Sequence, residues 1–292
     1  EWAVGSGGKS AASGNRQQAF VKKGTGEAEQ EEAGEVVRTA EVVKAHEVSA
    51  DCVVWAARGT GKTFLGAVAT LLDLVFKPGV QIKILGGSLE QSRRMHEHLC
   101  RLFERPGLAT LVDGEITARR VRLLNGSCAE VLAASQTSVR GSRVQKVRCD
   151  EVELFDPDLW RAVQLTTRSA PIAGPWGETV RGAVEALSTM HEPGGLMARV
   201  VEDAKGSRRI FRWGVLDVLA RCDERHECAS CTLRTECAGR VKERDRAGEV
   251  PGFVSVEDAL RLRSRVDQGT WESEMLCMRP RRASAVLSLI HI

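Results

Sequence analysis

The stretch Ala-Ala-Arg-Gly-Thr-Gly-Lys-Thr at residues 56–63 decides the fold. It follows the short apolar run 52–56 and precedes residues 62–76, whose apolar side chains recur at helical spacing. A glycine-containing turn between a strand and a helix is the context in which backbone N–H groups surround a phosphate. The stretch therefore predicts a phosphate-binding loop, followed by a helix that begins near Lys62.

Each residue type in this loop has a physical role. The glycines allow a tight turn that aims N–H groups at phosphate oxygens. Lys62 should reach the β- and γ-phosphates of ATP, and the hydroxyl of Thr63 should lie on Mg²⁺. The usual first glycine is Ala56 here, a replacement that also occurs among helicase-like ATPases. The residues expected to bind the nucleotide are Ala57, Arg58, Gly59, Thr60, Gly61, Lys62 and Thr63.

Two adjacent carboxylates end a strand-like run farther along the chain. Residues 144–149 have a strand pattern that stops at Asp150 and Glu151. Asp150 can hold Mg²⁺ opposite Thr63, and Glu151 can orient or deprotonate the attacking water. Two surface acids at a strand end are the alternative interpretation. Because the phosphate loop is present, we expect Mg²⁺-dependent ATP hydrolysis.

Strands alternate with helices from residue 49 to about 220, including a tight hairpin at 121–133. This alternation predicts an α/β fold with a mostly parallel sheet and helices on both faces. The expected divisions are a disordered or non-native leader at 1–48, a P-loop ATPase core at 49–220, a cysteine-rich module at 221–245, a helical lid or linker at 246–285 and a non-native tail at 286–292.

Charge and hydropathy restrict the partners. The net charge is only +3, but residues 119–148 carry seven basic side chains against the single acid Glu130. Such a stretch can contact phosphate or form a solvated basic face, and charge alone leaves both open. No apolar run approaches the roughly 20 residues that a membrane-spanning helix needs, so we expect no membrane partner.

Four of the nine cysteines are crowded into 16 residues, as Cys222, Cys228, Cys231 and Cys237. The central Cys-x2-Cys spacing is common in zinc sites, and four thiolates complete a tetrahedron. An iron–sulfur cluster is the second possibility, and a chance group of free thiols is the third. We expect a metal, with zinc ahead of iron–sulfur, that stabilises a segment too polar to fold alone.

Over residues 52–216, the chain resembles the ATPase half of the large terminase subunit, the motor that packages DNA into tailed-phage capsids. The features that carry the resemblance are Arg58 inside the phosphate loop, Thr137–Arg143 before the acidic pair, Ile84–Gln91 after the second strand and Leu187–His191. The resemblance implies a P-loop NTPase of the additional-strand, helicase-like type. It also implies ATP-driven translocation of double-stranded DNA, with the portal protein, the small terminase subunit and a homo-oligomeric ring as partners. The location that it implies is the host cytoplasm, with transient binding at the procapsid portal.

The resemblance also implies residue roles. Arg58 would place a cation on the γ-phosphate in cis, and Arg140 would do so in trans from a neighbouring subunit. Ser188 and Thr189 would sense the γ-phosphate and couple its loss to the rest of the fold. The family usually carries a second, nuclease domain, and we expect no nuclease activity from these residues.

Two other functions remain open from the sequence. A helicase-like or repair DNA-dependent ATPase would need a second motor domain, for which few residues remain. A non-catalytic, nucleotide-gated DNA-binding or assembly protein would not require a catalytic acid, so Glu151 argues against it.

Overall fold

The computed structural model describes residues 49–171, 179–242 and 252–281. The expected leader at 1–48 and tail at 286–292 lie outside these residues. The strands are β1 (Cys52–Ala56), β2 (Gln81–Gly86), β3 (Arg120–Arg122), β4 (Cys128–Val131), β5 (Lys146–Asp150), β6 (Ala170–Pro171), β7 (Thr179–Val180), β8 (Ala183–Ser188) and β9 (Arg209–Trp213). The α-helices are α2 (Lys62–Phe76), α3 (Leu89–Phe103), α4 (Pro106–Ala109), α5 (Gln136–Arg140), α6 (Pro157–Gln164), α7 (Leu196–Ala204), α8 (Arg234–Cys237), α9 (Val256–Arg263) and α10 (Gln268–Thr270).

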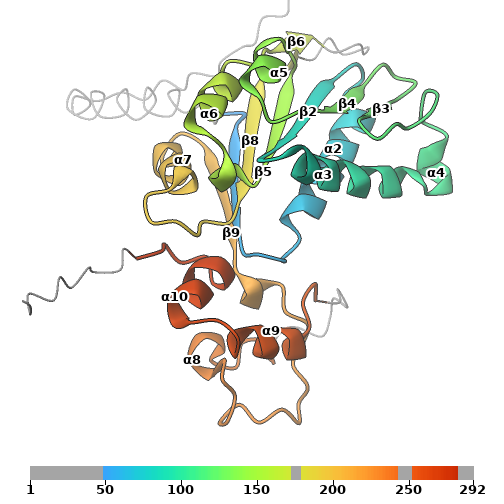
Figure 1. Ribbon diagram of the computed structural model, residues 1–292. Helices are drawn as coiled ribbons and strands as arrows, with labels where there is room; N and C mark the ends of the chain where they lie inside the picture. The colour runs from blue at the N-terminus through green and yellow to red at the C-terminus, as the bar shows by residue number, and fades with distance from the viewer. Residues whose placement is uncertain (1–48, 172–178, 243–251, 282–292) are drawn as a thin grey trace, which may run out of the picture. The chain divides into compact units, whose positions relative to one another are not determined.

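Seven of the strands form one sheet in the order β3-β4-β2-β5-β8-β1-β9 (Figure 1). Within this sheet β3 runs antiparallel to its neighbour, β4, and the other pairs are parallel. The expected mostly parallel α/β sheet is therefore confirmed, and so is the hairpin of β3 and β4.

Strand β8 lies between β1, which leads into the phosphate loop, and β5, which ends in the acidic pair. Trp55 is in register with Ser188, and Leu187 is in register with Asp150. This interposed strand is the arrangement expected of the additional-strand type. Because parallel strands end at the same edge, the phosphate loop, the acids and the end of β8 meet there.

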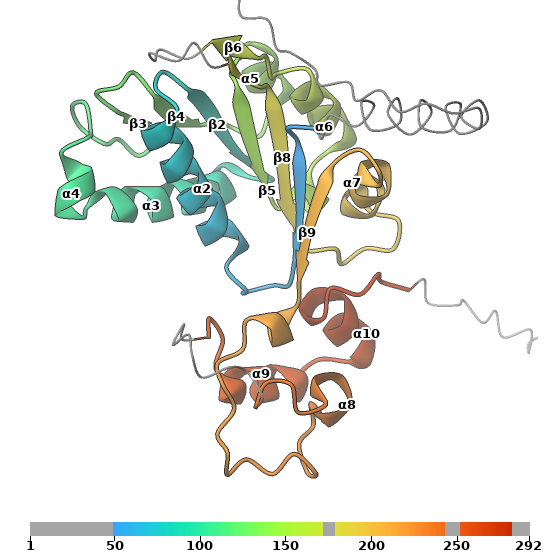
Figure 2. The same cartoon turned by 180° about the vertical axis from the view of Figure 1, so that it is seen from behind.

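Alternate residues of β1 belong to different hydrophobic clusters, as the two-residue period of a strand requires. Val53 and Trp55 pack in the cluster that contains α6 and α7 residues, whereas Val54 and Ala56 pack with α2 and α3 residues. Figure 2 shows these helix pairs on opposite sides of the sheet. The sheet is therefore buried on both faces, so polar functional groups can lie only where its strands end.

Local sequence patterns do not give every element its bounds. Helix α6 begins at Pro157 and ends at Gln164. The glycine and serines at 138–142 favour a loop, but residues 136–140 form the short helix α5, because Ser135 caps it by accepting a hydrogen bond from the Ser138 amide. Residues Trp271–Met275 are helical, with π-helical hydrogen bonds.

A third hydrophobic cluster joins the residues after β9. Two short 3-10 helices occur among the described residues, Val152–Leu154 after β5 and Val215–Asp217 after β9. The second contributes Val215 and Leu216 to a cluster that contains the buried Trp271 and Met275. Cys222 and Leu233 of the cysteine-rich segment belong to the same cluster. The cysteine-rich segment and the C-terminal helices thus share one small core.

Candidate functional site

The phosphate loop takes a backbone shape that glycine favours. Gly59 and Gly61 have φ values of 70° and 91°, in the left-handed region. Helix α2 begins directly after Gly61, so its N-terminal end faces the loop. Strand β9 holds the loop from the side, because the indole nitrogen of Trp213 donates to the hydroxyl of Thr60 at 3.0 Å. No periodicity in the sequence indicated this tryptophan.

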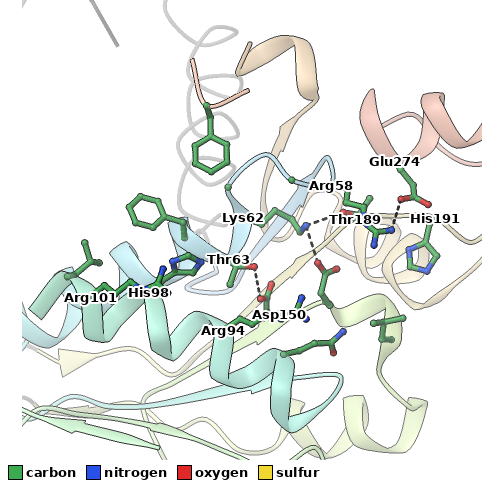
Figure 3. Close-up of a pocket in the computed structure, with 18 of the residues that line it drawn as sticks. Arg58, Lys62, Thr63, Arg94, His98, Arg101, Asp150, Thr189, His191 and Glu274 are labelled. Carbon is green, nitrogen blue, oxygen red and sulfur yellow. Dashed lines mark hydrogen bonds and ion pairs between the residues drawn. The ribbon is translucent and has the colours of Figure 1, made fainter. Parts of the chain in front are cut away.

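Lys62 is buried and points toward the acidic pair. Its side chain is 5% exposed, and its Nζ lies 3.2 Å from Glu151 Oε1. The same Nζ donates to Thr189 Oγ1 at 3.1 Å. The structure therefore brings together Lys62, Glu151 and Thr189, residues from three separate parts of the chain. Figure 3 shows the Lys62 side chain pointing toward Thr189.

Thr63 and Asp150, the two residues predicted to hold Mg²⁺, lie side by side. The Thr63 hydroxyl donates to Asp150 Oδ2 at 2.8 Å. The other carboxylate oxygen, Oδ1, is buried and has no hydrogen-bond partner among the residues that the structure describes. Burial, and then the neighbouring Glu151 carboxylate, raise the pKa of Asp150 to about 6. A hydroxyl beside a buried carboxylate with a spare oxygen fits a hard cation such as Mg²⁺.

Glu151 has a strained backbone. Its φ is 54°, which places a non-glycine residue in the left-handed region. Such conformations cost about 1–3 kcal/mol and occur where the surrounding structure fixes them, often at functional sites. The turn directs Glu151 toward Lys62 and Ser188, whose hydroxyl donates to Glu151 Oε2 at 3.5 Å.

Ser188 and Thr189, at the end of β8, contact the acid Glu151 and Lys62 respectively. Ser188 accepts a hydrogen bond from the Glu153 amide at 3.1 Å and donates to Glu151. Thr189 accepts from Lys62 and donates to the carbonyl of Ala56 at 3.0 Å. The two residues predicted to sense the γ-phosphate therefore touch the acid and the lysine.

Arg58 is directed away from Lys62. Its side chain is 78% exposed, and its Nη1 lies 3.3 Å from Glu274 Oε2. The Arg58 amide also donates to the Glu274 carbonyl at 2.9 Å. Figure 3 shows Arg58 turned toward Glu274 rather than toward Asp150. No local pattern indicates Glu274, because 216 residues separate the partners.

A cavity of about 970 Å³ surrounds this constellation. Its walls include His191 and residues that the sequence did not indicate: Phe64, Arg94, His98, Arg101, Arg105, Phe253 and Glu274. The Phe253 ring lies against the loop, since a Cβ added to Gly61 would be 3.3 Å from it. Arg94, His98 and Arg101 lie on one face of α3, because they are spaced by four and three residues.

Glu153 is another residue whose role the sequence did not indicate. It is 8% exposed, and its carboxylate accepts hydrogen bonds from the amides of Glu192 and Met197. The residue therefore fixes the turn between β8 and α7, directly after Ser188 and Thr189. A third acid after Asp150 and Glu151 gave no signal of this role in the sequence.

Arg140 does not line the cavity around Lys62. It ends helix α5 and lines another cavity, of about 720 Å³, together with Asp158 and Arg161. Arg140 therefore lies at the end of a short helix and faces a different cavity from that of Lys62. A contact with a neighbouring subunit stays a prediction.

The basic stretch at 119–148 is not uniformly exposed. Arg148 is 1% exposed and donates to Glu185 Oε2 at 2.6 Å and to Thr70 Oγ1 at 2.8 Å. Lys146 lies 2.9 Å from Asp73 and 2.8 Å from Glu185. Although burial opposes it, Arg148 and Lys146 lower the pKa of Asp73 to about 2. These two cations thus tie α2 to β5 and β8, and they do not face a phosphate.

The four clustered cysteines are free thiols that line a third cavity, of about 360 Å³. Within the described ranges, no three His, Cys, Asp or Glu side chains lie close enough together to hold a metal ion. The tetrahedral zinc site expected from the spacing is thus not shown, and a metal at these four cysteines stays a prediction. No helix among the described residues is long and apolar enough to span a membrane.

No protein-family model and no curated protein matches the chain. The large terminase of bacteriophage HK97 is 16% identical, with a TM-score of 0.55 over 78% of this chain and 47% of that chain. The large terminase ATPase domain of Thermus phage P74-26 is 14% identical, with a TM-score of 0.47 over 80% of this chain and 90% of that chain. The large terminase of a thermophilic bacteriophage is 14% identical, with a TM-score of 0.44 over 58% of this chain and 41% of that chain.

The chain therefore spans less than half of the HK97 protein and of the thermophilic bacteriophage protein. At these identities, structural similarity shows the fold alone. Of the three structures, only that of HK97 has a TM-score above 0.5, so it carries the comparison. The seven-stranded sheet, the order of its strands and the glycine loop after β1 give this chain a P-loop α/β fold, which it shares with the matched part of the HK97 bacteriophage large terminase.

Proposed function

We propose that this chain is the ATP-hydrolysing motor of viral double-stranded DNA packaging, the ATPase domain of a large terminase subunit. The observation that carries the proposal is the convergence of Lys62, Thr63, Asp150 and Glu151 at one edge of the sheet. Within this set, a cation, a hydroxyl and two carboxylates lie within 3.2 Å of their partners. These are the groups that phosphoryl transfer to water requires.

Thr63 and Asp150 would hold Mg²⁺, which supplies charge neutralisation for the β- and γ-phosphates when bound. The Thr63 hydroxyl offers a lone pair, and the buried Asp150 Oδ1 has no competing partner among the described residues. Both are oxygen ligands of the kind that Mg²⁺ prefers.

Glu151 is the proposed general base or water-orienting residue. The Lys62 ammonium lies 3.2 Å from the Glu151 carboxylate. An incoming γ-phosphate carries more negative charge than Glu151, so it attracts the Lys62 ammonium and leaves the Glu151 carboxylate for water. Nucleotide binding would thus prepare the base, because the same lysine serves both partners.

Ser188 and Thr189 are proposed to report the γ-phosphate to β8. Thr189 shares the Lys62 ammonium, and Ser188 contacts Glu151, so any movement of either group changes a hydrogen bond at the end of β8. Glu153 and the turn before α7 would transmit the change, since the Glu153 amide donates to Ser188.

The two arginines are proposed to act at different stages. Arg58 would leave Glu274 for the γ-phosphate in cis, and its exposed position gives it the freedom to move. Arg140 would act in trans on the nucleotide of a neighbouring subunit. Double-stranded DNA, a portal protein, a small terminase subunit and a ring of copies of this chain are the partners that this proposal implies, all as in the family that shares the fold.

DNA-stimulated hydrolysis tests the proposal. Phosphate release from MgATP should rise when linear double-stranded DNA is added to the wild-type chain. Lys205→Ala, which removes an exposed lysine paired with its helical neighbour Glu202, should respond equally. Stimulation by single-stranded but not by double-stranded DNA would favour a helicase-like ATPase. Tight ATP binding without any release of phosphate would favour a nucleotide-gated assembly protein.

A further inference from the structure

The four clustered cysteines face one space. Cys222, Cys228, Cys231 and Cys237 all line the cavity of about 360 Å³, and none forms a disulfide. Cys222 is buried, and its thiol lies within electrostatic range of the other three. Four soft sulfur ligands around one cavity are an arrangement suited to a thiophilic metal group.

The backbone alone gives this segment little support. In the described stretch between the 3-10 helix Val215–Asp217 and residue 242, the only regular element is the four-residue helix α8. The backbone hydrogen bonds near the cysteines are local, from Cys231 to Cys228, from Arg234 to Cys231 and from Cys237 to Leu233. A group that joins all four thiols would add a constraint to the one that the shared hydrophobic cluster supplies through Cys222 and Leu233.

The lack of a close ligand group favours a cluster over one ion. A single zinc ion needs its thiolates at about 2.3 Å, which forces the sulfurs close to one another. In the described residues, no such group of three ligands exists. A cubane cluster holds its thiolates farther apart, because each sulfur binds a different iron. The cavity of about 360 Å³ that the four cysteines help to line provides room for the cluster itself.

The walls of the cavity suit a negatively charged cluster. Leu219, Leu233 and Val256 supply apolar surface that excludes water. Arg234 and Lys242 line the same cavity and can offset the charge of four thiolates. The ring nitrogen His226 Nε2 also belongs to this wall, is buried and has no partner among the described residues, so it is available to a cluster sulfide.

We propose that Cys222, Cys228, Cys231 and Cys237 bind a [4Fe–4S] cluster with a structural role. The cluster would fix the segment that follows Ala220. The amide of Ala220 donates to the Val254 carbonyl at 2.7 Å, and the Val254 amide donates to Val218 at 3.2 Å. Phe253, adjacent to Val254, lies against Gly61 of the phosphate loop. The cluster would therefore support one wall of the nucleotide cavity without contacting Lys62, Asp150 or Glu151.

Metal analysis of anaerobically purified wild-type protein tests this proposal. The expected result is about four iron and four acid-labile sulfide atoms per chain, with broad visible absorbance that bleaches on reduction. Cys228→Ser and Cys231→Ser should each lose most of the iron. Cys100→Ser, which removes a thiol on α3 outside the cavity, should keep the iron of the wild type.

One zinc per chain without sulfide would overturn the cluster and leave a mononuclear site. Folded, anaerobic protein with no metal after reconstitution with iron and sulfide would overturn both. The wild-type measurement stands even where the serine variants fail to fold. Nucleotide binding is measured on the same samples, so a failure of the ATPase proposal and a failure of the cluster proposal give different results.

Discussion

The phosphate-loop site and the cysteine segment represent two ways of positioning functional groups. In the first, the ends of β1, β5 and β8 bring Lys62, Asp150 and Ser188 together, and the hydrogen bonds of the sheet fix their spacing. In the second, four thiols surround a cavity within turns and one short helix. A site at strand ends exists before its ligand arrives. A site in turns depends on its ligand for its own geometry.

Lys62→Ala should produce the largest effect. It removes a side chain that is only 5% exposed and that lies beside Glu151 at the edge of the sheet. The β- and γ-phosphate charge would be uncompensated, so ATP hydrolysis should fall about 10³-fold or more. Steady-state phosphate release measures the loss, and the melting temperature checks that the fold survives. Near-normal turnover in the variant would break the assignment of this edge as the reacting site.

Arg140→Ala should lower only the assembly-dependent rate, by about 10³-fold if the residue acts as an arginine finger. ATP affinity should stay that of the wild type, because Arg140 lies in a different cavity from Lys62. Mixing this variant with Lys62→Ala protein should restore some hydrolysis, since each copy supplies what the other lacks. No recovery in demonstrably mixed assemblies would leave Arg140 as a DNA or packing contact.

Asp150→Asn tests whether the buried charge of Asp150, at the end of β5, lowers the stability of the fold. The pKa of Asp150 is about 6 in the folded chain, above an unfolded value of about 3.9, so its ionised form costs stability at neutral pH. In Mg²⁺-free buffer at pH 7.5, the variant should raise the free energy of unfolding by about 3 kcal/mol. The gain should shrink at pH 5, where wild-type Asp150 is mostly protonated. Denaturant unfolding at both pH values measures it, and an equal gain at both would refute this cause.

Glu274→Gln should have the smallest effect, because its ion pair with Arg58 is largely exposed on the arginine side. Freeing Arg58 should raise basal hydrolysis by at most about fivefold. Glu272→Gln is the matched control, two residues away and 3.9 Å from Arg281 instead of near Arg58. Equal rates for both variants and the wild type would show that Glu274 does not restrain Arg58.

The difference between the two regions also explains how far the sequence could be interpreted. The phosphate loop and the acidic pair were predictable, because a strand end and a glycine turn leave local patterns, whereas Ser188 was expected only from the resemblance to the terminase family. Glu274, Trp213 and Phe253 were not predictable, since they reach the loop from distant parts of the chain. The basic stretch was misleading at Arg148, because its partners, Asp73 and Glu185, lie on other elements. The spacing of the cysteines predicted a metal site but not the distances between the thiols.

The central claim is that Glu151 drives hydrolysis at a site that binds ATP without it. Glu151→Gln keeps the size and the hydrogen-bonding reach of the side chain but cannot accept the proton of water. Equilibrium ATP binding and single-turnover hydrolysis of the same protein test the claim together. We predict an affinity within about threefold of the wild type and a rate lower by about 10²–10⁴-fold. A variant that hydrolyses at the wild-type rate, or that no longer binds ATP, would contradict the account.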